Sequence, residues 1–220
     1  ILDVYNLPEQ KEVFDDICQG KTESVFQLSF NLLTKFCKRI KPQSIKDLSD
    51  TVAIVRPGTL DALLEDGKTT MAEAYIARKH NKMPVTYAHP EMEKHLSNTY
   101  GIVLYQEQVQ AMFSDLAEYP PEEADYYREL LAKKKKQEIE KFIPDLRKRL
   151  SEKGWNELQS QVFVNIVISA SQYGFNYSHS AAYGTVAYMC SFLKHHFPLE
   201  WWTAVLQNSK VEEIRDKDYA

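Results

Sequence analysis

Apolar residues recur at helical spacing along almost the whole of this 220-residue chain. The clearest case follows Asn156, a good helix cap, where one face of a helix would carry Leu158, Val162, Phe163, Ile166, Val167 and Ala170. Gly and Pro, seven and nine residues, fall mostly where these patterns stop. We therefore predict a mainly α, multi-helix fold with at most one or two short strands.

Caps and breakers set the expected elements. Residues 101–105 are the best strand candidate, with a helix start as the alternative. No repeat or linker divides the chain, so we expect one domain over 1–220. Helices are expected at 7–20, 28–40, 44–55, 70–80, 91–97, 106–116, 120–136, 137–153, 156–172, 178–196 and 198–208.

Several classes of function find no support. Cys18, Cys37 and Cys190 form no CxxC pair, which argues against a zinc knuckle or a disulfide framework and favours a reducing, cytoplasmic setting. No phosphate loop, zinc-protease motif, signal peptide or membrane-length apolar run is present. We expect neither a catalytic residue nor a metal site. The chain begins without Met and ends in a charged run, so it reads as a piece of something longer.

Residues 128–153 are locally basic, with ten positive and five negative side chains in a chain whose net charge is −4. Four consecutive lysines, 133–136, would point around every side of a helix and reach a nearby phosphate. From charge alone, a solvated helix surface is the favoured alternative.

Residues 173–180, Tyr-Gly-Phe-Asn-Tyr-Ser-His-Ser, form a second candidate site. A glycine turn before a helix exposes backbone N–H groups at the positive helix end, where anions bind. Asn176 and His179 supply donors beside it, and Tyr177 could stack on a base. An ordinary helix cap is an equally good interpretation of the residues by themselves. Arg56 lies in a rigid Arg-Pro-Gly turn, which alone is a weak signal.

Taken in order, these fragments resemble the fingers of the C-family replicative DNA polymerases, the bacterial DNA polymerase III alpha family. The resemblance covers about residues 7–208, and its specificity comes from the order and spacing of several short segments. These are Ser24–Ser29, Ala53–Thr59, Arg78–Asn81, Thr99–Gln110, Ala124–Lys134, Tyr173–Gly184 and Leu193–Trp201.

The resemblance implies that the chain binds the incoming deoxynucleotide and the primer–template. The nucleotide-facing residues would be Arg128, Lys133, Lys134, Asn176 and His179. The catalytic aspartates and their Mg²⁺ would belong to the palm, outside this chain, with residues 1–20 at its edge and 209–220 starting the following region. Sliding-clamp and replisome partners would bind elsewhere in the polymerase. We expect Arg56, Lys135, Lys136 and Tyr177 to contact nucleic acid.

The chain departs from the family pattern at several positions. Glu129 replaces the second arginine of a pair, Ala132 replaces a glycine, and Tyr177 replaces a lysine. We interpret it as a divergent member, with a phage genome as one source left open. Two rivals also stay open: a helical nucleic-acid-binding module without polymerase activity, and an all-α interaction protein whose basic helix is only a surface.

Overall fold

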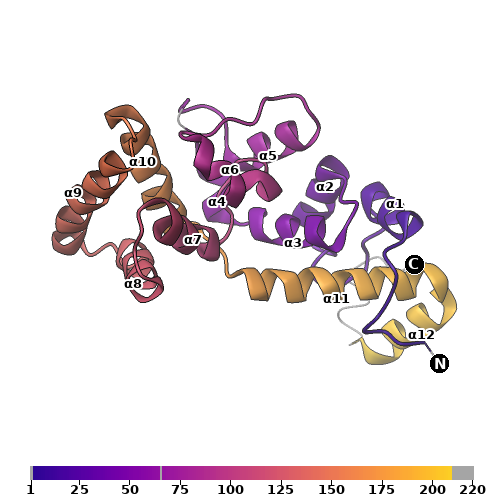
Figure 1. The fold of residues 1–220 in the computed structure, drawn as a ribbon. Coiled ribbons are helices and arrows are strands. Elements are labelled where there is room, and N and C mark those ends of the chain that lie inside the picture. The colour runs from indigo at the N-terminus through magenta and orange to yellow at the C-terminus, as the bar shows by residue number, and fades with distance from the viewer. Residues whose placement is uncertain (1, 65, 210–220) are drawn as a thin grey trace. The chain divides into compact units, whose positions relative to one another are not determined.

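The computed structural model describes residues 2–64 and 66–209, and their backbone is almost entirely helix and loop (Figure 1). The mainly α prediction is confirmed. The chain divides into two compact units, residues 1–52 with 181–220, and residues 53–180. Whether these units behave as the single expected domain stays a prediction, and nearly all of the segment 209–220 lies outside the described residues.

The first unit is built around Tyr188, whose ring stacks on Phe14 with 4.9 Å between centroids. Its hydroxyl donates to the Pro8 carbonyl at 2.6 Å and accepts from the Gln10 N–H at 2.8 Å. This buried hydroxyl is therefore hydrogen-bonded both as a donor and as an acceptor. The helices of this unit are α1 (Lys11–Gln19), α2 (Asn31–Ile40), most of α3 (Ile45–Ile54), most of α11 (Tyr177–His196) and α12 (Pro198–Asn208).

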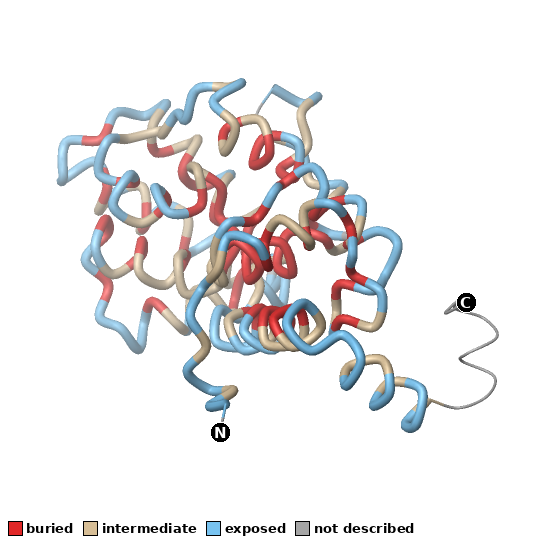
Figure 2. Tube along the Cα trace, turned by 90° about the vertical axis from the view of Figure 1, so that its right-hand side faces the viewer, coloured by how far each residue is buried: buried red, intermediate tan, exposed pale blue. Residues whose placement is uncertain are grey.

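The start of α3 follows from the sequence. Ser44 caps α3 by accepting the Asp47 N–H at 3.1 Å, while the Asp47 carboxylate accepts the Gln43 N–H at 2.9 Å, close to the expected capping box. The last helix, α12, has no buried residue and is exposed or intermediate along its length (Figure 2).

The second unit has Phe113 at its centre. The Phe113 ring meets Phe142 and Phe163 edge to face, at centroid distances of 5.4 and 6.4 Å. Figure 1 shows α7 to α10 grouped around this core. The elements are α4 (Pro57–Asp61), α5 (Met71–Lys79), η1 (Pro90–Met92), α6 (Glu93–Leu96), η2 (Ser97–Thr99), α7 (Gln106–Leu116), α8 (Pro121–Ala132), α9 (Lys136–Glu152) and α10 (Glu157–Tyr173).

Side-chain caps place the helix starts of this unit where they were expected. Thr70 Oγ1 accepts the Glu73 N–H at 3.2 Å at the start of α5. Asn156 and Gln159 form a reciprocal capping box at the start of α10, with both bonds at 2.9 Å. These two predictions are confirmed because a local hydrogen bond decides where each helix begins.

Two expectations about this unit were wrong. Residues 101–105 form no strand; a single parallel bridge pairs Tyr105 with Phe175. The four lysines do not share a helix, because α8 ends at Ala132, Lys134 takes a left-handed conformation (φ 53°) and α9 begins at Lys136. In a continuous helix, Lys133 and Lys136 would lie three residues apart on one face, where like charges repel. The break also lets α8 and α9 pack into the same core.

Among the described residues, no helix combines the length and the apolar character that crossing a bilayer requires.

Candidate functional site

The glycine turn at 173–176 joins α10 to α11, and Asn176 caps the second helix. Its Oδ1 accepts the His179 N–H at 2.8 Å, so α11 begins at Tyr177, one residue before the expected start. The cap holds Asn176 and His179 in one helical turn, as the sequence predicts.

Backbone hydrogen bonds fasten this turn to the segment before α7. The Phe175 N–H donates to the Leu104 carbonyl, and the Gln106 N–H donates to the Phe175 carbonyl, both at 2.9 Å. Gly174 permits this approach: a Cβ built there would lie 2.9 Å from the Ala170 carbonyl oxygen and 3.2 Å from Gln106 Cγ. Residues 104–106 and 173–176 are thus closely packed against each other where α7 and α11 begin, and we call this contact the joint.

We expect Gly174→Ala to lower the free energy of unfolding by about 2 kcal/mol, because the added methyl meets fixed backbone rather than a mobile side chain. Thermal or urea unfolding would measure it. Ser178→Ala, an exposed change in the first turn of α11, is the matched control and should unfold like the wild type. Equal stabilities for the two variants would contradict the close fit.

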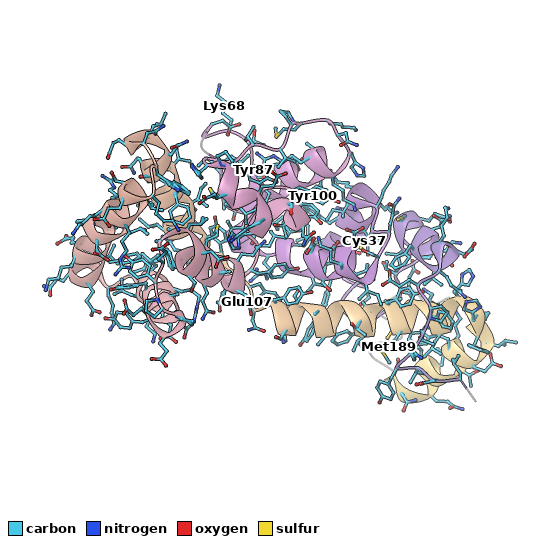
Figure 3. The ribbon with its side chains drawn as sticks, viewed as in Figure 1. Cys37, Lys68, Tyr87, Tyr100, Glu107 and Met189 are labelled. Carbon is cyan, nitrogen blue, oxygen red and sulfur yellow. The ribbon has the colours of Figure 1, made fainter. Side chains whose placement is uncertain are left out.

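The Glu107 carboxylate occupies the positive end of α11. Its two oxygens each accept the Tyr177 N–H at 3.0 Å, and Oε1 also accepts Asn176 Nδ2 at 3.0 Å. Figure 3 labels Glu107 beside the beginning of α11. The sequence predicts an anion site here, and the structure shows an anion from the chain itself in it.

Arg128 on α8 reaches the same turn through Gln106. Its Nε and Nη2 donate to Asp125 Oδ1 at 2.9 and 2.8 Å, and its Nη1 donates to Gln106 Oε1 at 3.3 Å. Gln106 Nε2 in turn donates to the Gly174 carbonyl at 3.0 Å. Two predicted sites far apart in sequence are therefore joined by one side chain.

Sequence reasoning missed Gln106 and Glu107 as site residues. Both belong to the segment Thr99–Gln110, which carried part of the family resemblance without any role for its polar side chains. A Gln-Glu-Gln run at a helix start was the available signal, since consecutive polar residues there can cap more than one backbone segment. The third member, Gln108, accepts the Leu104 and Tyr105 N–H groups at 2.9 and 3.0 Å.

The lysine turn, residues 133–136, stands apart from this joint. Lys133 Nζ pairs with Glu129 at 2.5 Å and Lys135 Nζ with Glu138 at 3.3 Å, all on exposed or half-exposed side chains. Lys134 is exposed, and the Lys136 side chain lies outside what the structure describes. Within the described part, no hydrogen bond or ion pair links these lysines to the start of α11.

Arg56 points inward. Its Nε donates to the Ala53 carbonyl at 2.8 Å, its Nη2 donates to the Tyr173 carbonyl at 3.1 Å, and its guanidinium carbon lies 3.9 Å from the centre of the Phe175 ring. Burial lowers the pKa of this guanidinium. Arg56 therefore braces the glycine turn, a contact the sequence does not reveal.

Two rings remain beside the joint. Tyr177, 47% exposed, meets Tyr105 edge to face at 5.0 Å between centroids, and His179 meets Phe175 in the same way at 5.3 Å. In an edge-to-face pair one ring presents its edge to the face of the other, so Tyr105 covers at most one face of the Tyr177 ring. No group of three or more His, Cys, Asp or Glu side chains in the described chain could hold a metal ion.

Comparison with known proteins identifies the family. The family model for the bacterial DNA polymerase III alpha subunit finger domain matches residues 2–154 of the sequence. The DNA polymerase III alpha subunit of Aquifex aeolicus is 34% identical over 202 residues, 92% of this chain and 17% of that protein. The subunit of Staphylococcus epidermidis is 30% identical over 208 residues, 94% of the chain and 19% of that protein. This chain thus spans less than a fifth of these relatives and belongs to the bacterial DNA polymerase III alpha subunit finger domain family.

Proposed function

We propose that this chain is the fingers part of a replicative DNA polymerase and binds the triphosphate of the incoming deoxynucleotide beside the primer–template. The observation that carries the proposal is the joint at Gln106, which connects the Arg128 guanidinium to the helix start bearing Asn176 and His179. A cation and amide donors held around one point suit an anionic group with several oxygens.

The contribution of these residues to the reaction is positional and electrostatic. Arg128 has five N–H donors, of which Asp125 and Gln106 take three, so two remain for phosphate oxygens. Lys133 and Lys134 would add charge from the lysine turn that follows α8. Such contacts neutralise a triphosphate and hold its α-phosphate in line for attack.

The chemistry itself would take place outside this chain. The palm of the full-length protein would hold the carboxylates and Mg²⁺, which stabilise the attacking and leaving oxygens when bound. We therefore propose that this chain alone is inactive, that the whole polymerase works in the cytoplasm, and that clamp and replisome proteins bind its other regions.

Single-nucleotide incorporation by the full-length protein tests the proposal. Incorporation should need Mg²⁺ and a primer–template and should saturate with the matching deoxynucleotide. A protein that binds DNA tightly at low salt and incorporates nothing would instead support the rival, a nucleic-acid-binding module without polymerase activity.

The lysine turn gives a separate prediction about DNA. Changing both Lys135 and Lys136 to Ala in the full-length protein should weaken primer–template binding, because each lost phosphate contact reduces the slope of log affinity against log salt by about 1. Lys82→Ala, an exposed lysine in a loop of the same unit, is the matched control. An unchanged salt slope in the double variant would remove these lysines from the DNA interface.

A further inference from the structure

Glu107 is the group at the joint that the family resemblance leaves without a role. Its carboxylate accepts hydrogen bonds from the Tyr177 N–H and from Asn176 Nδ2, all at 3.0 Å. The Tyr177 N–H and the capping residue Asn176 lie at the start of α11, whereas Glu107 itself stands in the first turn of α7. One side chain therefore ties the starts of two helices together.

This carboxylate is well stabilised where it stands. Negative charge is favoured at the N-terminal end of a helix, and Glu107 lies at two such ends, those of α7 and α11. A phosphate that took over the Tyr177 N–H would have to displace a charge already compensated by both helices. It would also leave the Glu107 charge close beside its own.

The contact leaves Asn176 able to bind a ligand. An amide NH₂ group has two donors, and Glu107 accepts from Asn176 Nδ2 once, while the Asn176 Oδ1 is fixed by the His179 N–H. With one hydrogen and the oxygen both held, the direction of the second N–H is set. Glu107 thus fixes the direction of this exposed amide and leaves its second N–H available to a ligand.

We propose that Glu107 is a positioning residue for nucleotide binding. It occupies the Tyr177 N–H at the start of α11 and orients Asn176, so that the triphosphate meets the Asn176 amide, His179 and Arg128 rather than that N–H. Gln106 supports it by holding Arg128 to the Gly174 carbonyl. The proposal rests on the function proposed above.

Steady-state incorporation by the full-length polymerase tests it, with Glu107→Ala and Glu107→Gln. Alanine removes every acceptor, so the KM for the deoxynucleotide should rise about 10-fold or more through misplacement of the turn. Glutamine keeps one acceptor oxygen and should rescue part of the loss. The Kd for primer–template, measured in parallel, should stay within about twofold, since the lysine turn and the rest of the protein are untouched.

Asn156→Ala is the matched control for simple destabilisation. It removes the N-cap of α10 in the same unit, far along the chain from the glycine turn, and no described hydrogen bond joins Asn156 to that turn. This variant should lower the Tm and leave the nucleotide KM unchanged. If the KM rose in proportion to the loss of Tm in Asn156→Ala as well as in Glu107→Ala, Glu107 would have a structural role only, and the proposal would be overturned.

Two other results would overturn it. A nucleotide KM below that of the wild type in Glu107→Gln would mean that the carboxylate competes with the triphosphate for the helix end. A KM unchanged in both Glu107 variants would mean that the orientation of Asn176 does not matter. If Arg128→Ala still raises the KM in either case, the proposed function stands and only the role of Glu107 fails.

Discussion

Replacing Arg128 by alanine in the full-length polymerase is expected to raise the nucleotide KM, or lower kcat, by about 10-fold to 100-fold. A charge-assisted hydrogen bond is worth about 1.5–3 kcal/mol, which converts to a factor of that size. The Arg128 side chain is only 15% exposed, and its guanidinium is held by Asp125 and Gln106. Its two remaining N–H groups therefore have a fixed direction, and little entropy is lost when they bind.

The controls for Arg128 separate charge, geometry and stability. Arg128→Lys keeps the charge but loses the planar fork, so it should recover only part of the activity. Arg147→Ala removes an arginine whose Nη1 pairs with Glu157 at 3.2 Å, away from the glycine turn, and should leave nucleotide kinetics unchanged. Wild-type kinetics in Arg128→Ala would remove this residue from the nucleotide site.

Replacing Arg56 by alanine is expected to lower the free energy of unfolding by about 3 kcal/mol. Two carbonyls, those of Ala53 and Tyr173, would lose their donor, and the Phe175 ring would lose the cation above it. Urea or thermal unfolding measures this change. The loss should also loosen the glycine turn, since the Tyr173 carbonyl and the Phe175 ring both belong to it.

The variant Arg56→Lys distinguishes a structural role of Arg56 at the glycine turn from a role in contacting DNA. A lysine has one ammonium group and cannot donate to two carbonyls while stacking on a ring, so its stability should lie near that of the alanine variant. A phosphate contact would behave in the opposite way: stability would be kept in both variants, while DNA binding would fall in alanine and recover in lysine. Lys82→Ala, an exposed lysine in a loop of the same unit, is a control with little expected effect.

Glu129 is the family departure whose effect is clearest in the structure. Its carboxylate pairs with Lys133 Nζ at 2.5 Å and lies 3.8 Å from Arg128 Nη2. The hydrogen bond from Lys133 and the charge of that lysine hold the pKa of Glu129 below its usual value. If the resemblance holds at this position, the exchange of an arginine for Glu129 removes one cation and pairs a second, Lys133, while Arg128 keeps its hydrogen bonds to Asp125 and Gln106.

Local chemistry explains how far the sequence could predict the fold. Thr70 and Asn156 start helices through hydrogen bonds that span three residues, and Pro121 stands in the first turn of α8. Spacing of this kind is visible in the sequence. The helix break at the lysine turn could not be predicted from the sequence, because no Gly or Pro marks it. The break instead allows α8 and α9 to pack into one core.

The candidate site was predictable only in part. Asn176 and His179 could be placed together because they share a helix cap, but the contact between Asn176 and Glu107 joins residues 69 positions apart. Arg56 and Tyr173 are separated by 117 positions. Neither spacing has a periodic signature, so tertiary structure alone shows that Glu107 and Arg56 serve the turn.

Hydrogen–deuterium exchange on the full-length polymerase tests the central claim most directly. The protein would be bound to a primer–template with a dideoxy-terminated primer and compared with and without the next matching deoxynucleotide. We predict slower amide exchange at residues 125–135 and 173–180 when the matching nucleotide is present and no slowing with a mismatched one, because ordered contacts suppress local opening. Unchanged exchange in both segments, under conditions where the nucleotide is shown to bind, would contradict the claim that this chain holds the triphosphate.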